Sequence, residues 1–222
     1  MEEIELAIPG CFLSVSDDNL LIGSSRPLSS LSTAIYGGGL RTIRYAINHR
    51  LTHYYPSEKD FPGGSVPAYL EECARRLTAD PEESAVLLTA ATVSLYSHKI
   101  IQTGPVTVEI VTTGGVEKTA CRASAPALYR EEEGRFMPLG TINMMVLLKG
   151  RLPDGIMARA FITLTEGKTA ALQDLGIADV NNGLPATGTG TDGITFITDP
   201  KGPLFTDAGP FSELGAALAK AA

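Results

Sequence analysis

The sequence predicts an α+β fold: a single domain, residues 1–222, in which a mixed or antiparallel sheet packs with helices. Segments rich in β-branched residues and segments with helical periodicity are mixed along the chain without strict strand–helix–strand alternation, which favours this class. The 222 residues suffice to bury a large core, and no internal repeat or break in composition divides them. A stretch at about 154–175 is apolar on most sides, which predicts one long central helix inside the protein.

The N-terminal half is expected to begin with strands and to continue with two helices. Apolar residues recur at helical spacing over residues 40–51, which predicts a helix there. Ser65 has the character of an N-cap and precedes a second apolar stripe, which predicts a helix over residues 66–77. Before these helices, three short apolar segments broken by turn residues predict an antiparallel meander: residues 4–8, 11–15 and 19–23.

The remainder of the chain continues this mixture. Residues 53–65 and 129–138 are turn-forming or charged and predict loops, and Asp154 is expected to cap the long helix. Residues 113–124 predict a turn that leads to another strand. Clusters or alternations of β-branched residues predict strands within 85–101 and at 105–113, 141–148 and 193–199, and a final helix follows at 211–222.

The charge and composition of the chain exclude several classes of function. The net charge is −7 and no run of Lys or Arg exceeds two residues, which argues against nucleic acid and against an anionic membrane surface. No apolar run approaches the ~20 residues of a membrane helix. The three cysteines are too few for a disulfide framework, and the acidic start lacks the features of a secretory signal. We therefore expect a cytoplasmic protein.

Lys168 is the first residue that indicates chemistry. It lies four residues after Leu164 and seven before Leu175, so it falls on the apolar stripe of the long helix. A buried ammonium group is costly unless it is paired, and burial easily lowers the pKa of an amine. The alternative is a lysine whose head reaches water at the edge of the sheet. Glu166 lies about 200° away around the helix and addresses its opposite side.

The loop at residues 187–193 alternates threonine with glycine and contains Asp192. Glycines let the backbone approach a ligand, and successive N–H groups can form an anion-binding nest. Asp192 could orient water, accept a proton or bond its own turn. The loop matches neither the Walker pattern nor the dinucleotide-binding pattern, and a purely structural Gly/Thr turn is the alternative. The ligand-binding residues that this interpretation assigns are Thr187, Gly188, Thr189 and Gly190.

Thr141 and Asn143 point to the same face of the strand predicted at 141–148, and apolar residues follow on that face. A buried asparagine must find partners. Asn143 therefore either ties down a neighbouring loop or presents its amide to a ligand.

The histidines and cysteines do not predict a metal site or a thiol nucleophile. His49 and His53 are four residues apart, which is a metal-like spacing, but no third ligand accompanies them and Pro56 follows. We interpret both as solvent-facing residues and His98, within an apolar strand, as a core histidine. No cysteine has a histidine close in sequence.

Four stretches, taken in order, resemble the adenosylcobinamide amidohydrolase (CbiZ) family: RPLSSLSTAIYGGG, GTIN, TEGKTAALQDLGI and NGLPATGTGTDG. They cover residues 26 to 193, and the ordered set is more specific than any one of them. The chain departs from the family's T-A-G-L-S-N-A turn at residues 112–118. It also has Gly167 where the family has alanine, and a glycine inside a helix suggests a close approach by another segment.

The resemblance implies an amidohydrolase of corrinoid salvage. Such an enzyme cleaves the aminopropanol amide of adenosylcobinamide to give adenosylcobyric acid. Cobalt arrives with the substrate, so no cofactor or protein-bound metal is expected, and a homodimer is a reasonable default. The altered turn at 112–118 leaves two alternatives open: a corrinoid-binding protein that does not cleave, and an amidase for a related small amide.

Roles for individual residues follow from the chemistry of amide hydrolysis, which needs an activated nucleophile, a stabilised oxyanion and a proton for the leaving amine. Asp192 or Glu166 is the expected base, Lys168 supplies charge or a proton, and backbone N–H groups around residues 188–190 form the oxyanion site. Asn143 orients the amide, and Thr191 as a covalent nucleophile ranks second. The periphery of the substrate is assigned to Ser29, Ser30, Gly37, Gly38 and Gly39.

Overall fold

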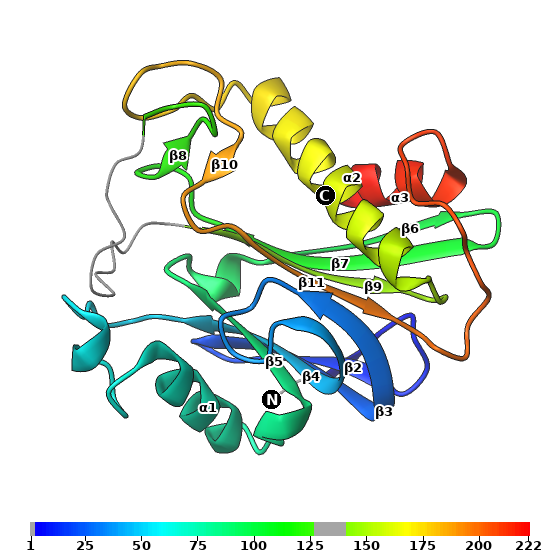
Figure 1. The fold of residues 1–222 in the computed structure, drawn as a ribbon, viewed down its shortest axis with the longest axis horizontal. Coiled ribbons are helices and arrows are strands. Elements are labelled where there is room, and N and C mark those ends of the chain that lie inside the picture. Colours follow the sequence, from blue (N-terminus) through cyan, green and yellow to red (C-terminus); the bar gives the residue numbers. More distant parts are fainter. Residues whose placement is uncertain (1–2, 127–140) are drawn as a thin grey trace.

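The computed structural model describes residues 3–126 and 141–222, and it contains one large mixed sheet with helices on two sides (Figure 1). Nine strands form this sheet in the order β1-β2-β3-β11-β9-β7-β6, with β4 paired to β3 and β5 paired to β4. The pairs β4–β5 and β9–β11 are parallel and the others are antiparallel. The mixed sheet confirms the α+β class. The predicted loop at 129–138 lies outside the described residues.

The strands are β1 (Glu3–Glu5), β2 (Cys11–Val15), β3 (Asn19–Ser32), β4 (Gly39–Arg50), β5 (Ser84–Thr89), β6 (Ser97–Thr103), β7 (Val106–Gly114), β8 (Ala120–Cys121), β9 (Ile142–Leu148), β10 (Gly188–Thr189) and β11 (Gly193–Thr198). The α-helices are α1 (Val66–Arg76), α2 (Asp154–Asp174) and α3 (Glu213–Ala221), and 3-10 turns lie at Glu58–Asp60, Pro81–Glu83 and Val93–Leu95. Strands β8 and β10 form a separate pair. The structure confirms the predicted N-terminal meander and the helix after the Ser65 cap, whose hydroxyl accepts from Ala68 N at 3.2 Å.

The large sheet is curled so that its two halves share one core. Strand β3 pairs with β2 through its first half and with β11 through its second half, and a register shift between Gly23 and Leu28 marks the bend. One buried cluster joins Ile43 of β4 and Leu87 of β5 to Met145 of β9. The face of β9 that carries Met145 therefore packs toward β4 and β5.

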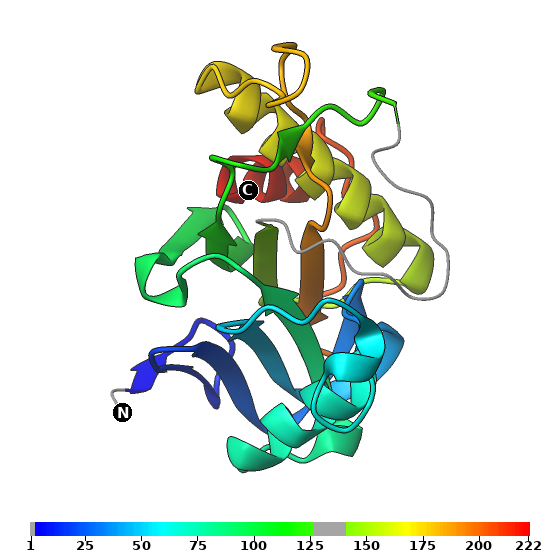
Figure 2. The same ribbon diagram turned by 90° about the vertical axis from the view of Figure 1, so that its left-hand side faces the viewer.

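The helices cover the outer faces of the two halves (Figure 2). Helices α2 and α3 pack on the half formed by β6, β7, β9 and β11, and α1 packs on β4 and β5. Alternate residues of β9 divide between the two cores: Met144 and Val146 face α2 and α3, whereas Met145 and Leu147 face the interior of the curl. This strand is buried on both faces along its whole length.

The helix predicted over residues 40–51 is wrong. These residues form β4, which lies between β3 and β5. Ile43 and Ile47 are both buried, but they face different cores, and Leu40 is 49% exposed. The apolar residues of β4 therefore do not alternate cleanly along the strand, and they match a helical spacing by coincidence.

The predicted long helix is present as α2, but its central position is not confirmed. One side of α2 is exposed, including Ile162 at 59%, and the buried side faces the sheet. The apolar residues of this side, Ile162 and Ala170, are exposed and not buried against another segment. Pro153 occupies the N-cap position, so Asp154 is the first helical residue and not the cap. Within the described residues, no helix is long and apolar enough to cross a membrane.

Gly167, in the middle of α2, lies where α3 crosses closely, as its position in the sequence suggests. A Cβ at this position would lie 2.7 Å from the carbonyl oxygen of Ala219 and 2.9 Å from its Cα. We expect Gly167→Ala to lower the free energy of unfolding by about 1–3 kcal/mol through overpacking. Alanine would otherwise favour the helix by about 1 kcal/mol.

Gly155→Ala is the matched control, because nothing lies within 4 Å of a Cβ at this position in the first turn of α2. Urea denaturation of both variants checks the prediction. A Gly167→Ala variant that is more stable than the unaltered protein would contradict the close packing of α2 and α3.

Candidate active site

The segments singled out in the sequence meet at the N-terminal ends of the parallel strands β9 and β11. Asn143 of β9 is directly paired with Gly193 of β11 in the sheet register. The loop before β11 carries Asp192, and α2 passes beside this loop with Lys168 on its inner side. Residues far apart in the chain therefore surround one point.

Lys168 and Asp192 form an ion pair at this point. The Lys168 side chain is 10% exposed and the Asp192 side chain 17%, and Lys168 Nζ donates to Asp192 Oδ2. The other oxygen, Oδ1, accepts from Ile142 N at 3.1 Å, from Thr189 N at 3.1 Å and from Thr189 Oγ1 at 2.5 Å. The apolar stripe of α2 predicted that Lys168 is buried, and the fold supplies its partner.

The Lys168–Asp192 pair fits in its place because Gly188 has no side chain. A Cβ on Gly188 would overlap Asp192 Oδ2 and would lie 2.7 Å from Lys168 Nζ. Gly188 lies in β10 opposite Cys121 of β8, and Thr169 of α2 donates to the Thr187 carbonyl at 3.1 Å. The small β8–β10 sheet thus holds the glycine-rich loop against α2.

A second anchor fixes the base of this small sheet. The buried carboxylate of Asp179 accepts from Arg122 N at 2.7 Å and from Asn181 N at 2.8 Å. These backbone hydrogen bonds lower the pKa of Asp179 below its ordinary value. Thr187 Oγ1 also accepts from Ala123 N at 2.9 Å, so Thr187 has a structural role in addition to any contact with a ligand.

Two hollows open beside the pair. The first, here called the lysine pocket, is lined by Lys168, Asp192, Cys121, Phe161 and Thr33 together with the predicted loop residues Thr187, Gly188, Thr189 and Gly190. Burial raises the pKa of the Cys121 thiol, and the nearby Asp192 carboxylate raises it further. The thiol is therefore protonated at neutral pH and is a poor nucleophile.

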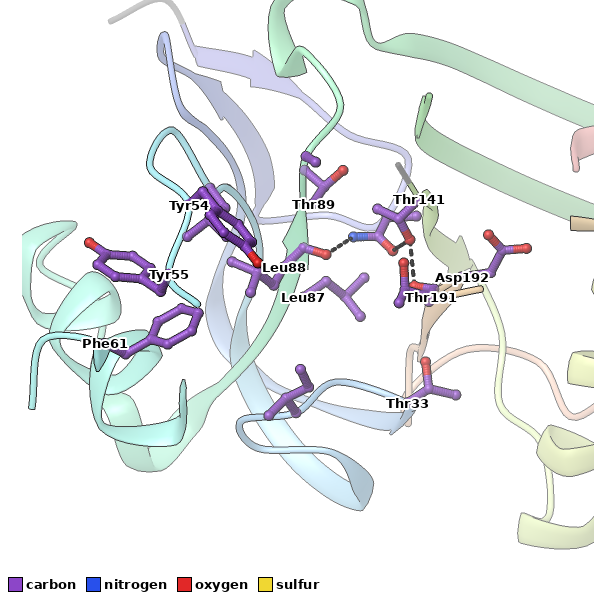
Figure 3. A pocket seen from close by; sticks show the side chains of 15 residues that line it. Thr33, Tyr54, Tyr55, Phe61, Leu87, Leu88, Thr89, Thr141, Thr191 and Asp192 are labelled. Atoms are coloured by element: carbon purple, nitrogen blue, oxygen red, sulfur yellow. Dashed lines mark hydrogen bonds between the residues drawn. The ribbon is translucent and has the colours of Figure 1, made fainter. Parts of the chain in front are cut away.

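The second hollow, here called the aromatic pocket, lies between β5 and the loop at residues 51–61 (Figure 3). Its empty volume, including the part open to solvent, is about 720 Å³. Figure 3 shows Tyr54, Tyr55 and Phe61 on one side, Thr33, Thr191 and Asp192 on the other, and Leu87 and Leu88 between. The Asp192 carboxylate turns away from the aromatic rings. Thr33 and Asp192 line both pockets.

Asn143 is part of a buried amide network behind the aromatic pocket. Its Nδ2 donates to Asn48 Oδ1 at 2.8 Å and to the Leu88 carbonyl at 3.0 Å, and Asn48 Nδ2 donates to Thr113 Oγ1 at 2.8 Å. Both N–H groups of the Asn143 amide are thus used to join β9 to β4 and β5. A ligand would find only Oδ1 of this amide, which also accepts from Thr141 Oγ1 at 3.4 Å.

Several residues predicted for the site lie elsewhere. Glu166 is exposed on the other side of α2, and Thr191 lines the aromatic pocket, where its carbonyl accepts from Thr141 Oγ1. The hydroxyl of Thr189 donates to Asp192 Oδ1. The residues predicted to bind the periphery of the substrate line neither pocket: Ser29, Ser30, Gly37, Gly38 and Gly39.

Ser29 and Ser30 lie outside both pockets because β3 is a long strand. Ser29 and Ser30 pair with Thr198 and Ile197, at the end of β11 remote from Gly193. Gly37 is close to Ser84, since a Cβ on Gly37 would overlap the Ser84 carbonyl oxygen. The glycines therefore turn the chain from β3 into β4 and do not open a helix.

The expectation of a solvent-facing His49 is also wrong. His49 is buried on β4 and bonds Asn19 Oδ1 and Tyr69 Oη, each at 2.7 Å, and burial lowers its pKa. His53 is exposed and packs on Tyr55 with ring centroids 5.0 Å apart. Among the described residues, no three His, Cys, Asp or Glu side chains lie close enough to hold a metal ion.

Sequence reasoning missed the aromatic side of the site. The turn residues of 53–65 predict a loop, but the concentration of aromatic residues there, with Tyr54, Tyr55 and Phe61 within eight positions, was a signal for a binding surface. Asn48 was missed because it lies in the segment assigned to the wrong helix.

The model of the CbiZ family, adenosylcobinamide amidohydrolase, matches residues 12–222. The chain belongs to this family. The match includes every residue of both pockets, and it confirms the resemblance of the four sequence stretches.

The chain is also similar to two other proteins, at lower sequence identity. An uncharacterized protein of Methanocaldococcus jannaschii is 28% identical over 173 residues, which are 72% of this chain and 66% of the relative. The aligned part thus spans slightly less than two thirds of that relative. A crystal structure of a Pyrococcus horikoshii protein is 14% identical, with a TM-score of 0.46 over 98% of this chain and 79% of the other.

Proposed function

We propose that this protein hydrolyses the amide that joins aminopropanol to the corrinoid in adenosylcobinamide, releasing adenosylcobyric acid and aminopropanol. Membership of the family supports the choice of substrate. The observation that carries the proposal is the buried Lys168–Asp192 pair at the wall of an open pocket. Buried charges in a cleft, held by several donors, are a frequent feature of catalytic sites.

In this proposal Lys168 stabilises the oxyanion. An ammonium group has three N–H donors, and one of them serves Asp192. The other two can donate to the carbonyl oxygen of the substrate as negative charge develops there. The backbone N–H of Thr189 cannot fill this role as the sequence suggests, because it already donates to Asp192.

Asp192 accepts the proton of the attacking water. In the free enzyme its two oxygens are surrounded by donors from Lys168, Thr189 and Ile142. When Lys168 turns toward the substrate, Oδ2 loses one of these donors and can accept a proton from water instead. The same proton then passes to the departing amine. Because cobalt belongs to the substrate, this mechanism requires no cofactor held by the protein.

A covalent route keeps the same pair but replaces water by a hydroxyl group. The Thr189 hydroxyl is placed for this role, because it donates to Asp192 Oδ1 at 2.5 Å. Its attack would form an ester with the corrinoid acid and release aminopropanol, and water would then cleave the ester.

The decisive experiment incubates purified protein with adenosylcobinamide, with and without a chelator, and detects adenosylcobyric acid by mass spectrometry. We expect product at the same rate in both samples. Corrinoid that stays bound and intact would overturn the proposal in favour of a binding protein. Release of amine from unrelated amides, without cleavage of adenosylcobinamide, would indicate an amidase with another substrate.

A further inference from the structure

Apart from Asp192, the residues that line the aromatic pocket take no part in the chemistry proposed for the amide, and their composition limits what the pocket can bind. Large apolar side chains at its mouth are left in solvent: Tyr54 is 54% exposed and Ile35 is 49% exposed. A surface of this kind beside a polar site is typical of a groove that binds part of a ligand.

One wall of the aromatic pocket is fixed. Phe61 is 3% exposed, and its ring centroid lies 4.4 Å from that of Tyr55 and 5.5 Å from that of Tyr69 on α1. Tyr54 is adjacent to Tyr55 in the sequence but is exposed, so its ring has room to change its orientation. A fixed aromatic wall and an adjustable ring together suit a flat group that stacks between them.

The charge of the pocket limits the chemistry of that group. Among the residues that the structure describes, no lysine or arginine lines it, and the carboxylate of Asp192 faces away from the aromatic rings (Figure 3). The pocket therefore does not favour a phosphate or a carboxylate. It suits a neutral heteroaromatic ring, since such rings stack on Tyr and Phe with about 1–3 kcal/mol per ring.

We infer that the aromatic pocket binds the adenosyl group of the corrinoid, with the adenine ring against Tyr54 and the Phe61 side. This inference rests on the proposed function. The adenosyl group is bonded to cobalt and the scissile amide lies on a side arm, so the enzyme needs two separate recesses. The two pockets provide them, and they share Thr33 and Asp192 at their junction.

The test compares two substrates that differ in the group on cobalt, adenosylcobinamide and methylcobinamide. Tyr54→Ala removes an exposed ring and should not affect folding. We expect it to raise KM for adenosylcobinamide by about tenfold while leaving kcat, and both constants for methylcobinamide, nearly unchanged. The matched control is Phe211→Ala, because Phe211 is fully exposed at 107%, precedes α3 and lies outside both pockets. Equal effects on both substrates, or no effect on either, would overturn the inference.

A binding measurement separates this inference from the proposed function. Saturation-transfer NMR with 5′-deoxyadenosine needs no turnover, and we expect contacts with the unaltered protein that disappear in Tyr54→Ala. Loss of binding in the variant would support the pocket even if the protein cleaved no amide. Absent binding, or binding that survives Tyr54→Ala, would overturn the pocket assignment and leave the amidohydrolase proposal intact.

Discussion

Lys168→Met is expected to reduce the turnover of adenosylcobinamide at least about 100-fold, the effect of removing an oxyanion donor. It is also expected to cost about 3 kcal/mol of stability. The pair is mostly buried, with side chains 10% and 17% exposed, so removing one partner leaves a buried charge unpaired. Asp192→Asn should lower turnover and stability in the same way.

The double variant Lys168→Met/Asp192→Asn distinguishes catalysis from structure. With both charges removed, we expect much of the stability to return, because replacing a buried pair by neutral groups is often nearly neutral. Turnover should remain lost. Urea denaturation and mass spectrometry of the product measure the two quantities on the same samples.

Two further variants complete this test. Lys149→Met removes an exposed lysine and controls for loss of charge alone. Glu166→Gln tests the other predicted base, and we expect normal turnover because Glu166 is exposed on the opposite side of α2. Full turnover by Lys168→Met would show that the pair is only structural.

Gly188→Ala is expected to have the second largest effect. The added methyl group would overlap Asp192 Oδ2 and press on Lys168 Nζ at 2.7 Å, so the pair must separate or the β8–β10 sheet must shift. We expect turnover to fall at least about tenfold and the free energy of unfolding to fall by about 1–3 kcal/mol, as for other overpacked sites. Because the φ of Gly188 lies outside the left-handed region, the effect is steric and not conformational.

Gly155→Ala again supplies the control, since a Cβ there meets no atom within 4 Å. Both variants are assayed for turnover and unfolding. Normal turnover in Gly188→Ala would mean that the pair tolerates displacement, and would weaken the proposed role of its geometry.

The local elements were accessible from the sequence wherever one face is buried. The alternation in Val106–Gly114 predicted β7, the Ser65 cap predicted α1, and the long apolar stripe predicted α2. Strand β4 was mistaken for a helix because its apolar residues face different cores and fall at helical spacing by coincidence.

The sequence also predicted some features of the candidate site but not others. The position of Lys168 on an apolar stripe indicated a buried cation, and the loop at 187–192 indicated polar chemistry. The sequence could not pair them, since Lys168 and Asp192 are 24 positions apart in the chain. The bond between Asn143 and Asn48 joins residues 95 positions apart, and it decides that the Asn143 amide is already engaged.

The sequence by itself determined the α+β class, most of the helices and strands, and the family. Periodicity and capping are local and are legible in a single chain. Only the tertiary structure decided which side chains meet. It placed Asp192 on Lys168, Glu166 on the exposed side of α2, and Ser29 and Ser30 outside both pockets, and it formed an aromatic pocket with the loop at 51–61. A repeating pattern predicts that one face of an element is buried. It does not predict which residues contact that face, because the curl of the sheet determines those contacts.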